Sequence, residues 1–131
     1  MTYLGIRERR IGAVSILDAD AEVRIGLKFG ARAVTLSRAV QSLLDDGRDQ
    51  ILLNLEQVPS ISSRGLAELV SAATVTTRKG GCFKLAHLNE TVLVIMRQAQ
   101  LLSYFEVFDA ESRAIDSFTA SLSKVSRGNM S

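Results

Sequence analysis

The chain has 131 residues, of which 47% are hydrophobic, so it is long enough for one globular domain with a modest core. Its 16 Lys and Arg against 14 Asp and Glu give a formal net charge of +2, and no basic stripe interleaved with aromatic residues supports nucleic-acid binding. The sequence has no apolar run near the roughly 20 residues of a membrane span, no signal-peptide core and a single cysteine, so a cytoplasmic protein without a membrane span is expected.

Two short strands open the chain, at Tyr3–Arg9 and Ala13–Ala19, and a turn at Ile11-Gly12 predicts that they form a hairpin. Residues 21–29 have no clear period and predict a loop. Between 31 and 46 the apolar residues recur at helical spacing, and Gly47 ends the predicted helix. The inner stripe of this helix consists of Leu36, Val40, Leu43 and Leu44.

The middle of the chain predicts a strand followed by a helix. The segment Ile51–Leu55 is nearly continuous aliphatic, as expected of a central strand. A helix over 64–79 follows, with basic residues in its last turn and Gly80-Gly81 after it. Its apolar stripe is Leu66, Leu69, Val70 and Ala73.

Cys82–Ala86 predicts a third core strand, in which Cys82 is expected to be a small core residue. Asn89 can cap the next helix, over 90–99. A short strand at Tyr104–Phe108 and a helix over 110–121 complete the series. The expected inner residues are Val92, Ile95, Met96 and Ala99 in the first of these helices, and Ala114, Ile115 and Phe118 in the second.

This alternation of strands and helices predicts a single α/β domain, with a mixed, largely parallel sheet of four or five strands and about four helices. No internal repeat or linker divides the chain. We therefore expect one domain over residues 1–122 and a polar C-terminal tail over residues 123–131.

Signatures of catalysis are absent from the sequence. It contains no phosphate-binding loop and no dinucleotide-binding glycine motif after a strand. His87 is the only histidine, so a zinc site would need carboxylates at unsupported spacings, and no pattern places a serine nucleophile beside it. We expect His87 to be a strand-end or loop residue, and the chain to be no enzyme and to hold no metal or cofactor.

Several segments between about Val14 and Phe118 occur in an informative order and spacing. They are the strand Ile51–Leu55, the segment Val58-Pro-Ser-Ile61 and the helix start Gly65-Leu-Ala-Glu-Leu69. Gly80-Gly81 before Cys82-Phe-Lys-Leu85, and Phe105-Glu-Val-Phe108 before a last helix, follow them. In these residues the sequence resembles the STAS domain family, which includes bacterial anti-sigma factor antagonists.

The resemblance implies a regulatory protein that binds an anti-sigma factor, which in this family is also a serine kinase. Phosphorylation of the antagonist breaks the complex, and a phosphatase restores it. Aligned on Gly65, the family's phosphorylated serine falls on Ser63, with Ser62 as a less favoured site. The implied partner-binding residues are Ser62, Ser63, Arg64 and Glu68.

Two residues of this motif depart from the family pattern. Ser62 stands where the family usually has Asp, and Arg64 where it tolerates small residues. Arg64 opposes the helix dipole, but it could also pair with a phosphate on Ser63, or it could deter a kinase that is shaped for an acidic loop. A simpler alternative is that one of the two serines only caps the helix.

Two other functions remain open from the sequence. The first is a STAS scaffold or transporter-associated subunit that is not phosphorylated. The second is a small-ligand-binding or enzymatic α/β domain, which would need a polar pocket that no sequence motif supplies.

The helix over 90–99 carries two aliphatic residues, Leu93 and Val94, outside its inner stripe. At 3.6 residues per turn both cannot share the inner face, so at least one should reach the surface. An exposed aliphatic cluster predicts a secondary contact, most simply a homodimer. Packing under the tail or a neighbouring loop is the alternative.

Overall fold

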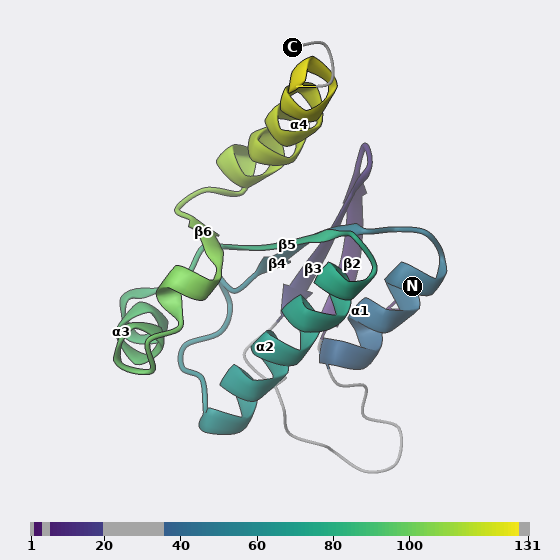
Figure 1. Cartoon of the computed structure of the whole chain (residues 1–131). Helices are drawn as coiled ribbons and strands as arrows, with labels where there is room; N and C mark the ends of the chain where they lie inside the picture. The colour runs from purple at the N-terminus through teal and green to yellow at the C-terminus, as the bar shows by residue number, and fades with distance from the viewer. Residues whose placement is uncertain (1, 4–5, 20–35, 129–131) are drawn as a thin grey trace.

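The computed structural model describes residues 2–3, 6–19 and 36–128, and Figure 1 shows a central sheet with helices on both faces. The strands are β1 (Thr2–Tyr3), β2 (Ile6–Ile11), β3 (Val14–Ala19), β4 (Gln50–Asn54), β5 (Cys82–Ala86) and β6 (Glu106–Phe108). The helices are α1 (Leu36–Asp45), α2 (Ser63–Arg78), α3 (Glu90–Gln98) and α4 (Glu111–Gly128), with a short 3-10 turn, η1 (Leu102–Tyr104).

The strands lie side by side in chain order from β1 to β6. β1, β2 and β3 pair antiparallel, whereas β3, β4, β5 and β6 pair parallel. The predicted α/β domain with a mixed, largely parallel sheet and four helices is confirmed. The sheet has six strands where four or five were expected, and the additional one is the two-residue edge strand β1.

The sheet separates two apolar clusters. α1, α2 and α3 contribute to the larger one, which contains Ile51 and Leu53 of β4. α4 covers the other face, where Phe118 packs with Leu52 and Ile16. Successive side chains of a strand point to opposite faces, so the aliphatic run of β4 serves both clusters. This explains why the run has no alternation.

The helix ends that glycine predicts are confirmed. Gly47 follows α1 with φ +78°, and Gly80 follows α2 with φ +77°, which is the left-handed region that favours glycine. The predicted loop over 21–29 and the start of the first predicted helix, at 31–35, lie outside the described residues. The hairpin turn falls at Gly12, between β2 and β3.

Three expectations need correction. α4 continues to Gly128, into the segment expected to be a polar tail, because no glycine or proline interrupts the sequence before that residue. Cys82 is exposed and not a core residue, since it is the first residue of β5, where the side-chain cover of the sheet begins. Ala99 is exposed because it lies at the C-cap of α3, beyond the last buried residue, Met96.

Candidate functional site

Ser62 and Ser63 lie at the N-terminus of α2 and have different roles. Ser62 is the N-cap: its backbone is extended, and its Oγ accepts a hydrogen bond from the Gly65 N–H at 3.1 Å. Ser63 is the first helical residue and is exposed. Within the described ranges its hydroxyl has no hydrogen-bond partner. The capping role that the sequence could give to either serine therefore belongs to Ser62.

The segment between β4 and α2 is anchored along its length. Asn54, at the end of β4, accepts a hydrogen bond from the Glu56 N–H through its Oδ1 at 2.9 Å. Asn89, the N-cap of α3, donates from its Nδ2 to the Val58 carbonyl oxygen at 2.8 Å. Val58 and Ile61 are buried in the larger core cluster. These contacts fix the position of Ser63 relative to the sheet.

The other two predicted contact residues also differ from each other. Arg64 is exposed and makes no ion pair with any residue that the structure describes. The Glu68 carboxylate, in contrast, accepts hydrogen bonds from the Ser37 backbone N–H at 3.3 Å and from the Ser37 hydroxyl at 3.1 Å. Ser37 lies in the first turn of α1, where a carboxylate interacts favourably with the positive end of the helix dipole. Glu68 thus joins α2 to α1.

These roles predict different effects of two serine substitutions on stability. Ser62→Ala is expected to lower the free energy of unfolding by about 1 kcal/mol, because it removes a helix cap. Ser63→Ala is expected to change it by less than about 0.5 kcal/mol, as at other exposed surface positions. Urea denaturation of the two variants checks this. A larger loss for Ser63→Ala would contradict the assignment of the cap.

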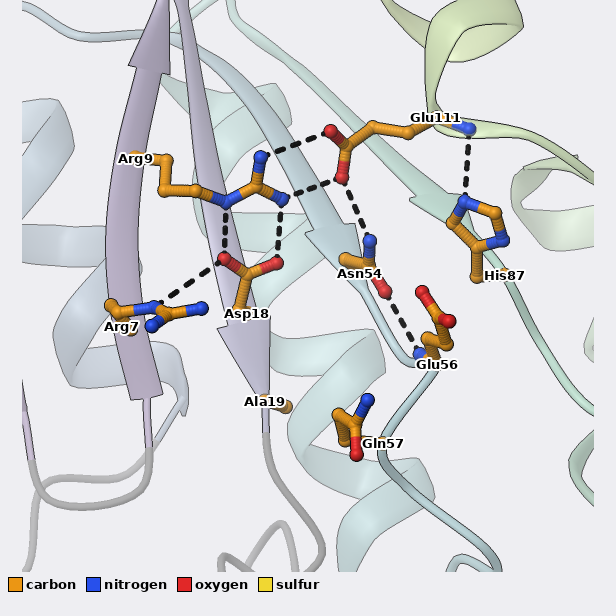
Figure 2. A pocket seen from close by; sticks show the side chains of 9 residues that line it. All are labelled: Arg7, Arg9, Asp18, Ala19, Asn54, Glu56, Gln57, His87 and Glu111. Carbon is orange, nitrogen blue, oxygen red and sulfur yellow. Dashed lines mark hydrogen bonds and ion pairs between the residues drawn. The ribbon is translucent and has the colours of Figure 1, made fainter.

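A second group of polar residues, which sequence reasoning missed, lies at the carboxyl ends of β3, β4 and β5 (Figure 2). It lines a pocket of about 330 Å³. The edge where parallel strands end is where ligands commonly bind in open α/β sheets. The lining residues are Arg7, Arg9, Asp18, Ala19, Asn54, Glu56, Gln57, His87 and Glu111.

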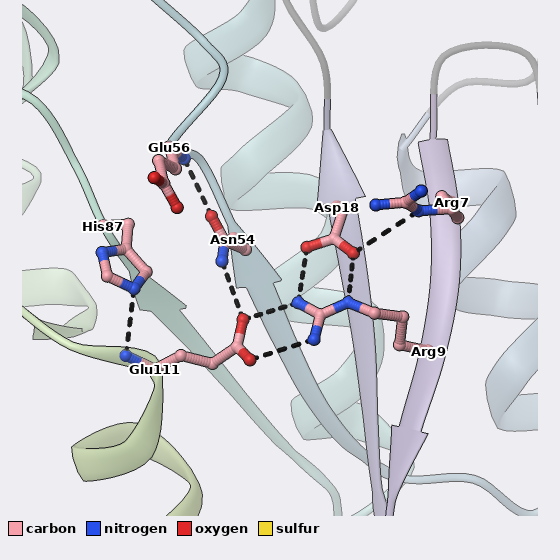
Figure 3. A network of polar contacts seen from close by, with 7 residues as sticks. All are labelled: Arg7, Arg9, Asp18, Asn54, Glu56, His87 and Glu111. Carbon is pink, nitrogen blue, oxygen red and sulfur yellow. Dashed lines mark hydrogen bonds and ion pairs between the residues drawn. The ribbon is translucent and has the colours of Figure 1, made fainter.

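Arg9 is the centre of the network that Figure 3 shows. Its guanidinium pairs with both oxygens of Asp18, one of them from Nη2 at 2.7 Å. It also donates to Glu111 from Nη1 at 3.0 Å and from Nη2 at 2.6 Å. Asn54 Nδ2 donates to the same Glu111 carboxylate at 2.8 Å. The network therefore ties β2, β3 and β4 to the first residue of α4.

The charges of this network stabilise one another. Hydrogen bonds to Asp18 and then to Glu111 raise the pKa of Arg9 above its already high ordinary value, against an opposing effect of burial. The hydrogen bond from Arg9 lowers the pKa of Glu111, and this effect outweighs the burial that would raise it. Asn54 lowers it further. Glu111 is therefore held in its charged form.

His87 follows β5, as expected of a strand-end residue, and has a left-handed backbone with φ +60°. Its Nε2 accepts a hydrogen bond from the Glu111 backbone N–H at 3.2 Å. Because this N–H is one of the unpaired donors at the start of α4, the imidazole serves as a cap supplied from another element. Nothing in the sequence around His87 predicts this contact.

The sequence signals for the network were weak. Arg7 and Arg9 read as scattered basic residues, although a predicted hairpin brings their strand beside Asp18. Glu111 is separated from Arg9 by 102 positions.

Among the described residues, no three histidine, cysteine or acidic side chains form a group that could hold a metal ion, and no helix is long and apolar enough to cross a membrane.

Comparisons with known proteins identify the fold. The family model of the STAS domain matches residues 14–114. No curated protein matches the sequence. Among solved structures, a candidate anti-sigma factor antagonist from Thermotoga maritima is 22% identical, with a TM-score of 0.67 over 86% of this chain and 92% of the other.

Two more solved structures share this fold at lower identity. An anti-sigma-factor antagonist (STAS) domain protein from Planctomyces limnophilus is 13% identical, with a TM-score of 0.70 over 87% of this chain and 97% of the other. The Bacillus cell fate determinant SpoIIAA, in its phosphorylated form, is 13% identical, with a TM-score of 0.62 over 86% and 98% of the two chains. At such identities the likeness concerns the fold.

Proposed function

The chain belongs to the STAS domain family, and we propose that it is an anti-sigma factor antagonist-like regulator, which binds an anti-sigma factor through the N-terminus of α2 and is no enzyme. The observation that supports this proposal is the exposed hydroxyl of Ser63 at the start of α2. Ser63 is the residue that the resemblance, aligned on Gly65, matches to the family's phosphorylated serine. Ser63 and Arg64 form the accessible part of the contact, with Ser62 and Glu68 holding the helix that presents them.

We further propose that phosphorylation of Ser63 by the anti-sigma factor, acting as a kinase, releases the partner, and that a phosphatase reverses the modification. A phosphate at this position lies near unpaired backbone N–H groups and the positive end of the α2 dipole. Arg64 can add a charge-assisted pair to it. Ser62 is the less suitable site, because its oxygen already caps the helix. SpoIIAA, which shares this fold, has been solved in a phosphorylated form, and this supports phosphorylation as a modification of the present chain.

The test of binding uses charge at Ser63. We expect Ser63→Asp to weaken partner binding at least tenfold, or about 1.4 kcal/mol, because it places a negative charge in the contact. Ser63→Ala should bind like the wild type. The anti-sigma factor is captured from the native cell with the tagged wild-type chain, identified by mass spectrometry, and then measured by calorimetry with each variant.

Thr77→Asp is the matched control. Thr77 is exposed on the same helix, 14 positions from Ser63 and hence about 21 Å along the axis. The Thr77→Asp variant should bind the anti-sigma factor with the same affinity as the wild type. Equal affinity of the wild type and Ser63→Asp would favour the scaffold or transporter-associated alternative. Incubation of the chain with the captured partner and ATP then shows whether Ser63 is phosphorylated; modification confined to Ser62 would reject the assignment.

Val94, with Leu93 beside it, is proposed to form a secondary contact between two copies of the chain. Val94 is 36% exposed, and Leu93 is half-buried. We expect Val94→Lys to have a lower sedimentation coefficient than the wild type, because the substitution disrupts a dimer. Thr91→Lys, at an exposed position of the same helix, should not. If wild type and both variants sediment as folded monomers at the same concentration, the dimer is rejected.

A further inference from the structure

None of the described residues that line the pocket at the carboxyl ends of the strands belongs to the partner contact proposed at the N-terminus of α2. In Figure 2, Arg7 lies at one end of it, Glu56 and His87 lie at the other, and the network centred on Arg9 lies between them. Its volume of about 330 Å³ is at the small end of the range for sites that bind metabolites.

The floor of the pocket is already occupied by internal bonds. Both oxygens of Asp18 and both oxygens of Glu111 accept from Arg9. Asn54 uses its Nδ2 toward Glu111 and its Oδ1 toward the Glu56 N–H. Because all these groups are paired, the floor is a rigid surface and has little left to offer a ligand.

The rim, in contrast, carries groups that are still available. The Arg7 side chain is 71% exposed, and its only pairing within the described ranges is a loose one, with Nε 3.9 Å from Asp18. The Glu56 carboxylate and the Gln57 amide are exposed and have no side-chain partner in the part of the chain that the structure describes. A guanidinium and a carboxylate are thus free to bind at opposite ends of one pocket.

The balance of charge narrows the ligand further. Among the described residues, the lining holds three carboxylates and two guanidiniums, and His87 accepts a hydrogen bond through Nε2. Side chains of both signs suit a solute that carries both charges better than a phosphate, which carries only negative ones. The separation of Arg7 from Glu56 favours a solute with opposite charges at its two ends.

We propose that this pocket binds a small amino-acid-like solute, with its carboxylate at Arg7 and a cationic group at Glu56. Gln57, beside Glu56, can add a neutral hydrogen bond to either a donor or an acceptor. The proposal does not rest on the function assigned to Ser63.

The probe for this proposal is free L-lysine, which carries both charges on a short flexible chain. Titration into the labelled full chain, followed by ¹H–¹⁵N correlation spectra at constant ionic strength and pH, should give saturable shifts of the Glu56, Gln57 and His87 amides. Cadaverine, which has only cationic ends, and glutarate, which lacks a cationic one, should bind at least tenfold more weakly. Equal binding of either control compound, or no saturable shift with lysine, would overturn the proposal.

Two variants test the assigned ends. Arg7→Gln and Glu56→Gln should each raise the dissociation constant for lysine at least tenfold. Arg10→Gln is the matched control for the first, since Arg10 is on the same strand but pairs with Glu8. Glu90→Gln, at an exposed position of α3, is the control for the second. All four spectra also report whether the variant is folded. The assignment would be refuted if the controls also lost binding, or if neither Arg7→Gln nor Glu56→Gln weakened it.

Discussion

Replacing Arg9 by glutamine is expected to lower the free energy of unfolding by about 2–3 kcal/mol. The substitution leaves the largely buried carboxylates of Asp18 and Glu111 without their shared cation and close to each other. Removing one partner of a fully buried pair costs about 3–5 kcal/mol. Because the Arg9 side chain is 37% exposed, solvent screening reduces the expected value.

Urea denaturation followed by circular dichroism measures this loss, with Arg10→Gln as the control. Arg10 is the next residue of β2 and its side chain is more exposed. Among the described residues it forms an ion pair with Glu8 alone, so its substitution should cost less than about 1 kcal/mol. If Arg9→Gln were as mild as Arg10→Gln, the network would contribute no more to stability than an exposed ion pair does.

The same network predicts how stability depends on pH. The pKa of Glu111 is lower in the folded chain than in the unfolded one, so the unfolded state takes up this proton first as the pH falls. The contribution of Glu111 is therefore fully present above about pH 4.3 and is lost as the pH falls through its lower folded-state pKa. In Arg9→Gln this acid-dependent loss should be smaller. A parallel decline of both proteins below that pH would contradict it.

Replacing Lys84 by alanine is expected to be the second large loss, of about 2–4 kcal/mol. Lys84 is 4% exposed on β5, and its Nζ donates to Ser117 Oγ at 2.8 Å and pairs with Glu106 at 3.0 Å. The Nζ also lies 4.6 Å from the centre of the Phe118 ring. Alanine removes this cation–π contact and leaves a cavity between β5 and α4.

Lys84→Met separates the two causes of that loss. Methionine keeps most of the volume without the charge, so it should recover much of the stability, because replacing a buried charge by an apolar side chain of similar volume is often neutral. Glu106→Gln should cost less than about 1 kcal/mol, since Glu106 is 65% exposed. Thermal unfolding of the three variants decides this. If methionine were as destabilising as alanine, the charge and not the packing would be the essential property.

The sequence alone determined most of the fold, because its signals are local. The aliphatic run Ile51–Leu55 predicts a central strand, and in the structure its residues supply both core clusters. Helical spacing identified the inner residues of α1, and Gly47 and Gly80 marked the helix ends, because few other residues adopt a positive φ readily. The family motif around Gly65 also follows from the sequence, and it led to the STAS domain.

Only the tertiary structure decided which side chains are buried by the elements packed against them and which stay exposed. Helical spacing predicted that Leu93 and Val94 could not both lie inside, but not that Val94 would be the exposed one. Cys82 reads as a core residue by its type and strand, yet its side chain lies at the start of β5, where it is exposed. Burial depends on which helices and strands pack against a residue, and the residues next to it in the sequence do not show this.

The candidate sites show the same division. Sequence placed Ser62 and Ser63 together at the start of a helix, whereas the backbone geometry assigned the cap to Ser62 and left the Ser63 hydroxyl exposed. The bond from Arg9 to Glu111 joins residues 102 positions apart. It exists because the strand order sets β2, β3 and β4 side by side beneath the start of α4, and that order is a property of the assembled sheet.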